Sequence, residues 1–104
     1  MNSTLSLAEL EANATKAEIL MKALSNKYRL MILCLLQENE LSVSELNKRI
    51  PIAQSTLSQH LAWLRREKYV KTRREAQTIH YQLGDKNIIK VIDLLHEIFC
   101  EEST

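Results

Sequence analysis

The side chains best suited to chemistry stand in one short polar run and in the basic stretch that follows it. The run supplies amide and hydroxyl groups from Gln54, Ser55, Thr56, Ser58 and Gln59. A glutamine can pair with an adenine edge through two hydrogen bonds, and serine or threonine can reach bases or phosphates. Between residues 54 and 80, six basic residues stand against two acidic ones, which leaves a charge of +4. Such a charge indicates a surface that faces phosphate groups.

The other reactive side chains are two cysteines and three histidines. Cys34 lies in an apolar run and Cys100 lies near the end of the chain. Composition alone favours two inert packing residues, because cysteine is among the most buried residue types. The histidines His60, His80 and His96 fall on three different predicted elements without metal-ligand spacing. We therefore interpret them as surface or packing residues.

Length and composition predict one domain over residues 1–104. Hydrophobic residues make up 45% and charged residues 26% of the chain, and a single glycine and a single proline favour mostly helical structure. No secretory signal and no apolar run near the ~20 residues of a membrane span are present, so we expect a cytoplasmic protein with reduced thiols. The sequence has no glycine-rich phosphate loop and no Cys-x-x-Cys pair, which argues against an enzyme. We expect no cofactor.

The apolar periodicity predicts four helices in the first two thirds of the chain. Apolar residues spaced by three and four predict helices over residues 5–24 and 54–67, and a helix over residues 27–37 is apolar on most sides. Ser42 with Glu45 three residues later forms the pattern of a capping box, which begins a short helix that ends before Pro51. Residues 42–67 are therefore two helices joined by a short turn.

After residue 67 the apolar period changes to two. Ile79, Tyr81 and Leu83 alternate with polar residues, which predicts a strand over residues 78–83 with residues 69–74 as its partner. This hairpin, residues 69–83, precedes a last helix over residues 86–100 that is capped near Asp85. The first and last helices carry more apolar surface than one small core needs. We therefore expect residues 5–24 and 85–102 to form a homodimer interface.

This order of elements predicts a mainly α fold with a small β-hairpin, a winged helix-turn-helix of five helices and a two-stranded wing. In such a fold the start of the second turn-flanking helix faces base edges of double-stranded DNA, and the wing meets the backbone or the minor groove. The predicted DNA-binding residues are Gln54, Ser55, Thr56, Ser58 and Gln59 on the helix and Arg73, Arg74 and Thr78 on the wing. The alternative is a well-capped, solvated helix start. Arg65, Arg66 and Lys68 could also serve only to complement the helix dipole.

Four segments resemble the ArsR-type family of dimeric bacterial repressors: residues 25–30, residues 54–61, the pair Leu64-Arg65 and residues 73–81. The resemblance covers nearly the whole chain. It implies a winged-helix dimer, joined through the first and last helices, that binds imperfect palindromic operators. Ala53 and Ala76 depart from the serine cap and the wing glycine that are frequent in the family.

Members of this family commonly bind metals, and the resemblance places their ligands at defined positions. A thiolate site would need cysteines near residues 44–46, where the chain has none. The interhelical pattern aligns with Asp85, Asn87, Ile98 and Glu101, which leaves two oxygen ligands, too few for zinc. We predict no metal site, and a metal-responsive repressor remains an alternative.

Four short segments resemble a thiol-sensing branch of the family. Two of them contain the cysteines, residues 33–34 and 99–100, and the others are residues 61–66 and 75–78. The resemblance implies that Cys34 and Cys100 are a redox pair that responds to a persulfide, a polysulfide or a peroxide. Our hypothesis is that the two cysteines of one subunit link on oxidation. The alternatives are a regulator that senses nothing and a winged helix that binds another protein. Repression and activation both stay open.

Overall fold

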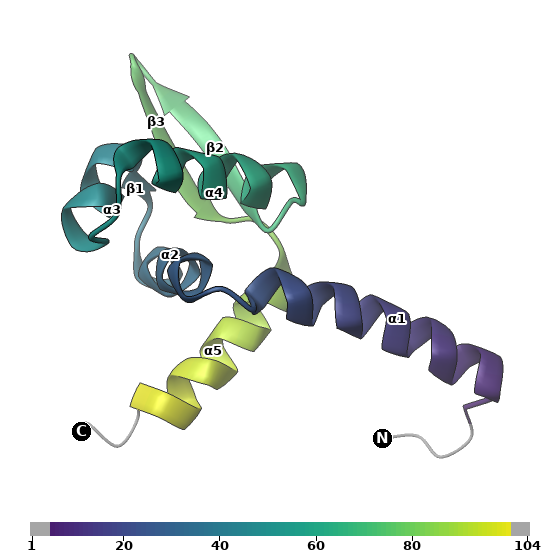
Figure 1. The fold of residues 1–104 in the computed structure, drawn as a ribbon. Helices are drawn as coiled ribbons and strands as arrows, with labels where there is room; N and C mark the ends of the chain where they lie inside the picture. Colours follow the sequence, from purple (N-terminus) through teal and green to yellow (C-terminus); the bar gives the residue numbers. More distant parts are fainter. Residues whose placement is uncertain (1–4, 101–104) are drawn as a thin grey trace.

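The computed structural model describes residues 5–100, with the side chains of residues 5–99. Over this range the chain forms five helices and a three-stranded sheet (Figure 1). The helices are α1 (Leu7–Leu24), α2 (Lys27–Glu38), α3 (Val43–Arg49), α4 (Gln54–Arg66) and α5 (Lys86–Cys100). The strands are β1 (Leu41–Ser42), β2 (Val70–Glu75) and β3 (Thr78–Leu83). The prediction of a mainly helical fold with a hairpin is confirmed.

Polar side chains fix where the helices begin. The Ser42 side chain accepts a hydrogen bond from the Glu45 amide at 3.2 Å, and the Glu45 carboxylate accepts one from the Ser42 amide at 2.8 Å. A second capping box, of Ser6 and Glu9, begins α1, and the Asn26 side chain caps α2. These bonds satisfy amides that have no acceptor inside the helix. The helix boundaries accordingly lie close to those that the sequence predicts.

The wing contains the predicted hairpin, but the prediction of only two strands was wrong. β1 joins the sheet in the antiparallel order β1-β3-β2, with Leu41 opposite Tyr81 and Ser42 opposite His80. The strand has two residues, too few to show an alternating pattern, and Ser42 is also the cap of α3. Leu41 is buried at the edge of the core, which holds β1 against β3.

Ala76 and Gly84 stand near the two ends of β3, and each has a structural requirement of its own. Ala76 has a φ of 57°, in the left-handed region that glycine favours, and it forms the turn with Gln77. Gly84 follows β3, where a Cβ would lie 2.9 Å from the carbonyl carbon of Val70 and 3.0 Å from the amide nitrogen of Lys71. Gly84 therefore allows β2 and β3 to approach closely, and the hairpin turn itself contains no glycine.

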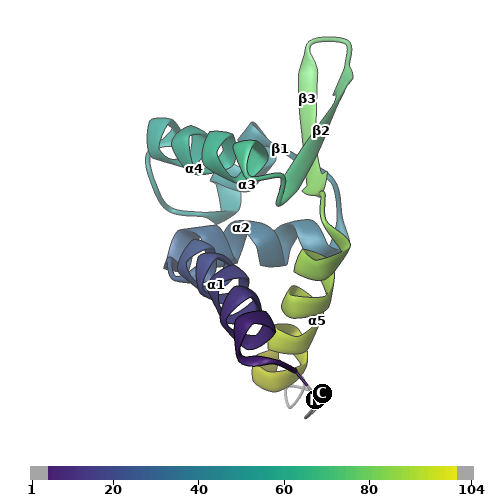
Figure 2. The same cartoon turned by 90° about the vertical axis from the view of Figure 1, so that its right-hand side faces the viewer.

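Figure 2 shows α2 lying below α4, with the hairpin rising beside them. The core is built from buried side chains of these elements together with α3 and α5. α2 contributes Ile32 and Leu33, neither of which is exposed. α4 contributes one apolar stripe, Leu57, Leu61 and Leu64, which is also fully buried. Burial of each such side chain is worth about 1.5–3 kcal/mol. The inner face of α4 is thus fixed to the core, and its outer face is left to solvent.

Arg29 joins three of the helices. From α2, its Nε donates to the Ala23 carbonyl at 2.7 Å, and its Nη2 donates to the Lys22 carbonyl at 3.3 Å, both near the end of α1. Its guanidinium also lies 4.7 Å from the centre of the Trp63 ring on α4. A cation at a helix C-terminus complements the helix dipole, and a cation over an indole ring is attracted to it. Arg29 therefore helps to hold α4 in a fixed orientation.

α1 and α5 expose apolar side chains at the end of the molecule away from the wing (Figure 1). The exposed apolar residues are Leu7, Leu10, Ile19 and Met21 on α1, and Ile89, Leu94, Ile98 and Phe99 on α5. A groove of about 370 Å³ lies between these two helices and the start of α2, with Leu30 and Val91 among its lining residues. Large exposed apolar patches mark sites of interaction.

Candidate nucleic-acid interface

The outer face of α4 presents the polar run that the sequence singles out. All five of its predicted base-reading residues are exposed: Gln54, Ser55, Thr56, Ser58 and Gln59. The N-cap residue Ala53 provides no side-chain hydrogen bond to the first turn. The amides at a helix start carry a partial positive charge and favour an anionic acceptor such as phosphate. This face can therefore offer both side-chain and backbone hydrogen bonds to a ligand in solvent.

A groove of about 410 Å³ separates the start of α4 from the wing. Gln54 lines it on the helix side, and Thr78 and Ile79 line it on the wing side. The start of α3 closes it with Ser42 and Ser44. Two predicted site residues that stand 24 positions apart in the sequence, Gln54 and Thr78, are thereby brought to one surface feature.

A second, basic groove lies beside the C-terminal end of α4. It has a volume of about 400 Å³ and is lined by Arg65, Lys68 and Lys71 together with the base of β2. Arg66 is exposed on the neighbouring turn of the helix. Within the described part of the chain, none of these four cations forms an ion pair with a carboxylate. Their charge is therefore directed to solvent.

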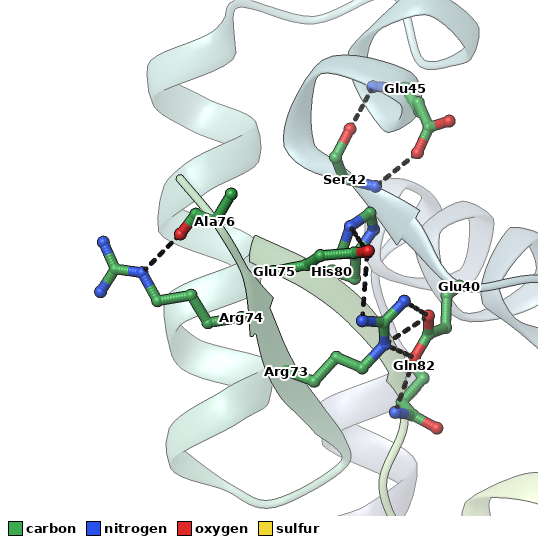
Figure 3. Close-up of polar contacts among 9 residues, drawn as sticks. All are labelled: Glu40, Ser42, Glu45, Arg73, Arg74, Glu75, Ala76, His80 and Gln82. Atoms are coloured by element: carbon green, nitrogen blue, oxygen red, sulfur yellow. Dashed lines mark hydrogen bonds and ion pairs between the residues drawn. The ribbon is translucent and has the colours of Figure 1, made fainter. Parts of the chain in front are cut away.

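The two adjacent wing arginines lie on opposite faces of the sheet (Figure 3). Successive side chains of a strand alternate between faces. Arg74 stands opposite Ile79 in the register, on the face that borders the α4 groove, and its Nε donates to the Ala76 carbonyl at 3.3 Å. Arg73 stands opposite His80 and points toward Glu40 on the other face. The wing therefore presents one arginine on each face.

Arg73 is engaged by two acidic side chains. Its guanidinium lies 2.8 Å from a Glu40 oxygen and 3.3 Å from a Glu75 oxygen. The hydrogen bond from Arg73 lowers the pKa of the Glu40 carboxyl, and the same bond raises the pKa of Arg73. Sequence analysis missed Glu40, because 33 residues separate it from Arg73 and only the pairing of β1 with β3 brings them together.

The cysteines occupy α2 and the end of α5. Cys34 is exposed on α2, which differs from the buried packing position that composition favours. Cys100 is the last residue of α5, and its side chain lies outside the described residues, as does Glu101. The Gln37 side chain of α2 donates a hydrogen bond to the Asp93 carboxylate of α5, so the two cysteine-bearing helices also share a polar contact.

Neither a metal site nor a membrane span is found in the part of the chain that the structure describes. Among those residues, no group of three or more histidine, cysteine, aspartate or glutamate side chains could hold a metal ion. No helix among them is long and apolar enough to cross a bilayer.

Comparisons with known proteins agree with this geometry. A family model described as bacterial regulatory protein, arsR family, matches residues 26–72. The transcriptional activator HlyU of Vibrio cholerae is 52% identical over 97 residues, which cover 93% of this chain and 90% of HlyU. The structure of reduced HlyU has a TM-score of 0.85 at 53% identity and covers 90% of this chain and 99% of that one.

Two further solved structures share the fold. The transcriptional repressor BigR from Xylella fastidiosa has a TM-score of 0.86 at 38% identity, with 95% of this chain and 98% of that chain covered. A homodimeric winged helix-turn-helix DNA-binding domain from Mycobacterium bovis has a TM-score of 0.72 at 25% identity, with 97% and 93% covered.

The fold and the surface around α4 define a winged-helix regulator. The chain belongs to the ArsR family of bacterial regulatory proteins. The family that residues 25–30, 54–61 and 73–81 resemble is thus confirmed, and HlyU and BigR belong to the branch that the cysteine motifs resemble. Its relatives are transcriptional regulators, so the chain is a regulator and not an enzyme.

Proposed function

We propose that this protein is a cytoplasmic, sequence-specific transcriptional regulator that reads double-stranded DNA with the outer face of α4. The observation that carries the proposal is the exposure of all five polar residues of the helix start on a helix whose opposite face is fully buried. Gln54 and Gln59 offer the amide groups that suit an adenine edge. A recognition helix contacts base edges in the major groove through its N-terminal residues.

The wing and the end of α4 supply the contacts to the DNA backbone. Thr78 lines the groove that faces α4, and Arg74 stands opposite Ile79, another of its lining residues, so both reach the backbone or the minor groove beside the bases that the helix reads. Arg65, Lys68 and Lys71 form the basic groove, and phosphates attract such unpaired cations. The predicted DNA contact of Arg73 is reconsidered below, since that side chain already has acidic partners.

The functional unit is a homodimer joined through α1 and α5. The exposed apolar side chains of both helices support this assembly, because a second copy would remove them from water. The homodimeric Mycobacterium bovis domain supports it as well. A two-fold dimer presents two recognition helices about 34 Å apart, which matches two half-sites of an imperfect palindromic operator.

The regulator is switched by Cys34 and Cys100. Exposure of Cys34 supports access of a small oxidant, and the solved structure of reduced HlyU supports a role for redox state in a relative. With peroxide, the two thiols lose two electrons and two protons to form a disulfide, and the peroxide is reduced to two waters. With a polysulfide inducer, one thiol attacks a sulfane sulfur and breaks its S–S bond, which gives a cysteine persulfide. The persulfide and the second thiol then join in a trisulfide, and a second sulfane sulfur of the inducer takes up the two electrons and two protons released and leaves as hydrogen sulfide. Either bridge ties α2 to α5 and shifts the dimer helices against the DNA-binding core.

Salt dependence tests the DNA-binding proposal. A duplex selected from a random-sequence pool is titrated with the protein at several salt concentrations, and fluorescence anisotropy gives the binding constant. Each phosphate contact contributes about −0.9 to the slope of log K against log salt. We expect a steep negative slope and a preference for the selected duplex over a scrambled one. Equal, salt-independent binding to both duplexes would contradict the proposal.

Operator affinity after oxidation tests the switch. We expect reduced protein to bind tightly and polysulfide-treated protein to bind at least about tenfold more weakly, a difference of about 1.4 kcal/mol. Cys34→Ser and Cys100→Ser should bind like the reduced protein before and after treatment. Mass spectrometry of the treated wild type should find a link between the peptides that contain Cys34 and Cys100. An unchanged affinity of the treated wild type rejects the switch.

A further inference from the structure

Glu40 occupies a junction between three parts of the fold. It lies in the segment between α2 and β1, directly before the strand that pairs with β3. Its carboxylate accepts hydrogen bonds from Arg73 Nε, at 2.9 Å to each oxygen, and from Gln82 Nε2 at 3.0 Å. Arg73 is on β2 and Gln82 is on β3, so one carboxylate joins both strands of the hairpin to the end of α2 (Figure 3).

The geometry of this contact is that of a strong, directional pair. A carboxylate that accepts two or more guanidinium hydrogen bonds fixes the orientation of the arginine as well as its distance. Glu75 adds a third anionic contact to the same guanidinium, at 3.3 Å. One arginine facing two carboxylates leaves a local charge of −1. The cluster of Arg73, Glu40 and Glu75 therefore offers no net positive charge to a phosphate.

Arg74 differs from Arg73 in each of these respects. No carboxylate within the described residues pairs with it, and its one hydrogen bond goes to the Ala76 carbonyl. It projects from the opposite face of β2, as Figure 3 shows. The Glu40–Arg73–Gln82 contact ties β2 and β3 to the segment that follows α2, so it restrains the orientation of that face toward α4.

We propose that Arg73 is a positioning residue, which with Glu40 locks the wing at the angle that presents Arg74 to DNA, and that Arg73 itself does not contact phosphate. This inference rests on the proposed DNA-binding function and assigns the wing contacts within it. It predicts a change in DNA affinity opposite to the one that charge alone would cause. Loss of the negative charge of Glu40 should weaken DNA binding, although removing an anion near DNA otherwise strengthens it.

The test compares six proteins on one selected duplex: wild type, Glu40→Gln, Arg73→Gln, the double variant of these two substitutions, Arg74→Gln and the matched control Glu38→Gln. Glu38 is exposed two residues before Glu40 and has no ion pair among the described residues, so its variant isolates the effect of losing one negative charge. We expect Glu40→Gln and Arg73→Gln each to weaken binding about fivefold, as the loss of one well-formed ion pair would. The double variant should be no weaker than either single variant.

The salt slope separates positioning from phosphate contact. Arg73→Gln should leave the slope of log K against log salt unchanged, whereas Arg74→Gln should flatten it by about 0.9. If instead Glu40→Gln binds more tightly than Glu38→Gln, or Arg73→Gln flattens the slope as Arg74→Gln does, Arg73 is a phosphate ligand and the proposal is overturned.

Hydrogen exchange of the DNA-free protein distinguishes a failure of the positioning role from a failure of the proposed DNA-binding function. Amides of residues 72–80 should exchange faster in Glu40→Gln and in Arg73→Gln than in wild type or Glu38→Gln. Unchanged exchange overturns the anchor whether or not DNA binds. Wild-type protein that binds no duplex in a salt-dependent manner overturns the DNA-binding function, and the positioning role then falls with it.

Discussion

At one end of the molecule α4 and the wing present amides, hydroxyls and arginines to solvent, whereas at the other end α1 and α5 present leucines, isoleucines and a phenylalanine. The polar end is stable in water without a partner, because its side chains are solvated and its helix is held from within by Leu57, Leu61 and Leu64. The apolar end gains about 25 cal/mol for each Å² that a partner covers.

The comparison shows that different kinds of observation indicate the function of each end. Exposure is informative by itself at the apolar end, where Phe99 is 69% exposed and Leu94 is 53% exposed. At the polar end exposure is ordinary. The informative observations there are the shared groove of Gln54 and Thr78 and, at the other end of α4, cations that pair with no carboxylate of the described residues.

The largest effect is expected at the apolar end. Leu94→Glu places a charge in the proposed dimer interface, so the protein should become monomeric, and operator binding should fall by about 10²-fold or more because the second half-site is lost. Sedimentation and fluorescence anisotropy measure the two outcomes. Leu94→Met, which keeps the apolar surface, is the control. A Leu94→Glu protein that stays dimeric and binds normally would place the interface elsewhere.

At the polar end, Gln59→Ala should cost about 1–3 kcal/mol of binding to the selected duplex and should reduce discrimination against a scrambled one. The reason is the loss of a bidentate amide contact to a base edge. Asn13→Ala removes an exposed amide from α1 and should change neither quantity. If the Gln59 variant discriminates as well as wild type does, that residue does not read bases.

The base of the wing is expected to be sensitive to volume. Gly84→Ala adds a Cβ 2.9 Å from backbone that cannot rotate away, so the strands must separate there. Overpacking of this kind costs typically about 1–3 kcal/mol of the free energy of unfolding. Urea unfolding measures the loss, with Ala62→Gly, an exposed substitution inside α4, as a comparison of similar chemistry. Unchanged stability would mean that β2 and β3 yield locally.

The smallest effect concerns acid. Hydrogen bonds from Ser6 lower the pKa of Glu9, those from Ser42 lower the pKa of Glu45, and Arg73 lowers the pKa of Glu40. A carboxyl whose pKa is lower in the folded state stabilises the fold above its unfolded pKa, near 4.5, and this contribution is lost as the pH falls through the folded value.

Stability should therefore decline as the pH falls below about 4.5, and Glu45→Gln should reduce the slope of that decline. Denaturant titrations at each pH measure it. Glu40→Gln at the polar end and Glu9→Gln at the apolar end should each also reduce the slope of stability against pH. A variant set with the wild-type pH dependence would show that these carboxyls titrate alike in the folded and unfolded chain.

Local signals made much of the fold predictable. The capping pattern of Ser42 and Glu45 and the constraint of Pro51 determine α3, and the change of apolar period after residue 67 reveals the hairpin. β1 was missed because two residues cannot show a period. The exposure of Cys34 was not predicted, since its apolar neighbours gave no indication of which side of α2 faces solvent.

The candidate site was predictable where one helix face carries it. Gln54 to Gln59 lie within two turns, so their common exposure follows from helical geometry. The roles of the wing residues were harder to predict, because nothing in the sequence distinguishes the adjacent Arg73 and Arg74. Only the register of β2 on β3, and the position of Glu40 next to β1, distinguish them.

The most direct test of the account maps the DNA surface residue by residue. Amide chemical shifts of the reduced protein are recorded by NMR while a selected duplex is added. The account predicts that the largest changes fall on residues 54–59 and 74–78, with little change along the exposed stretches of α1 and α5. Changes confined to α1 and α5, with α4 unaffected, would contradict the assignment of α4 as the helix that reads DNA.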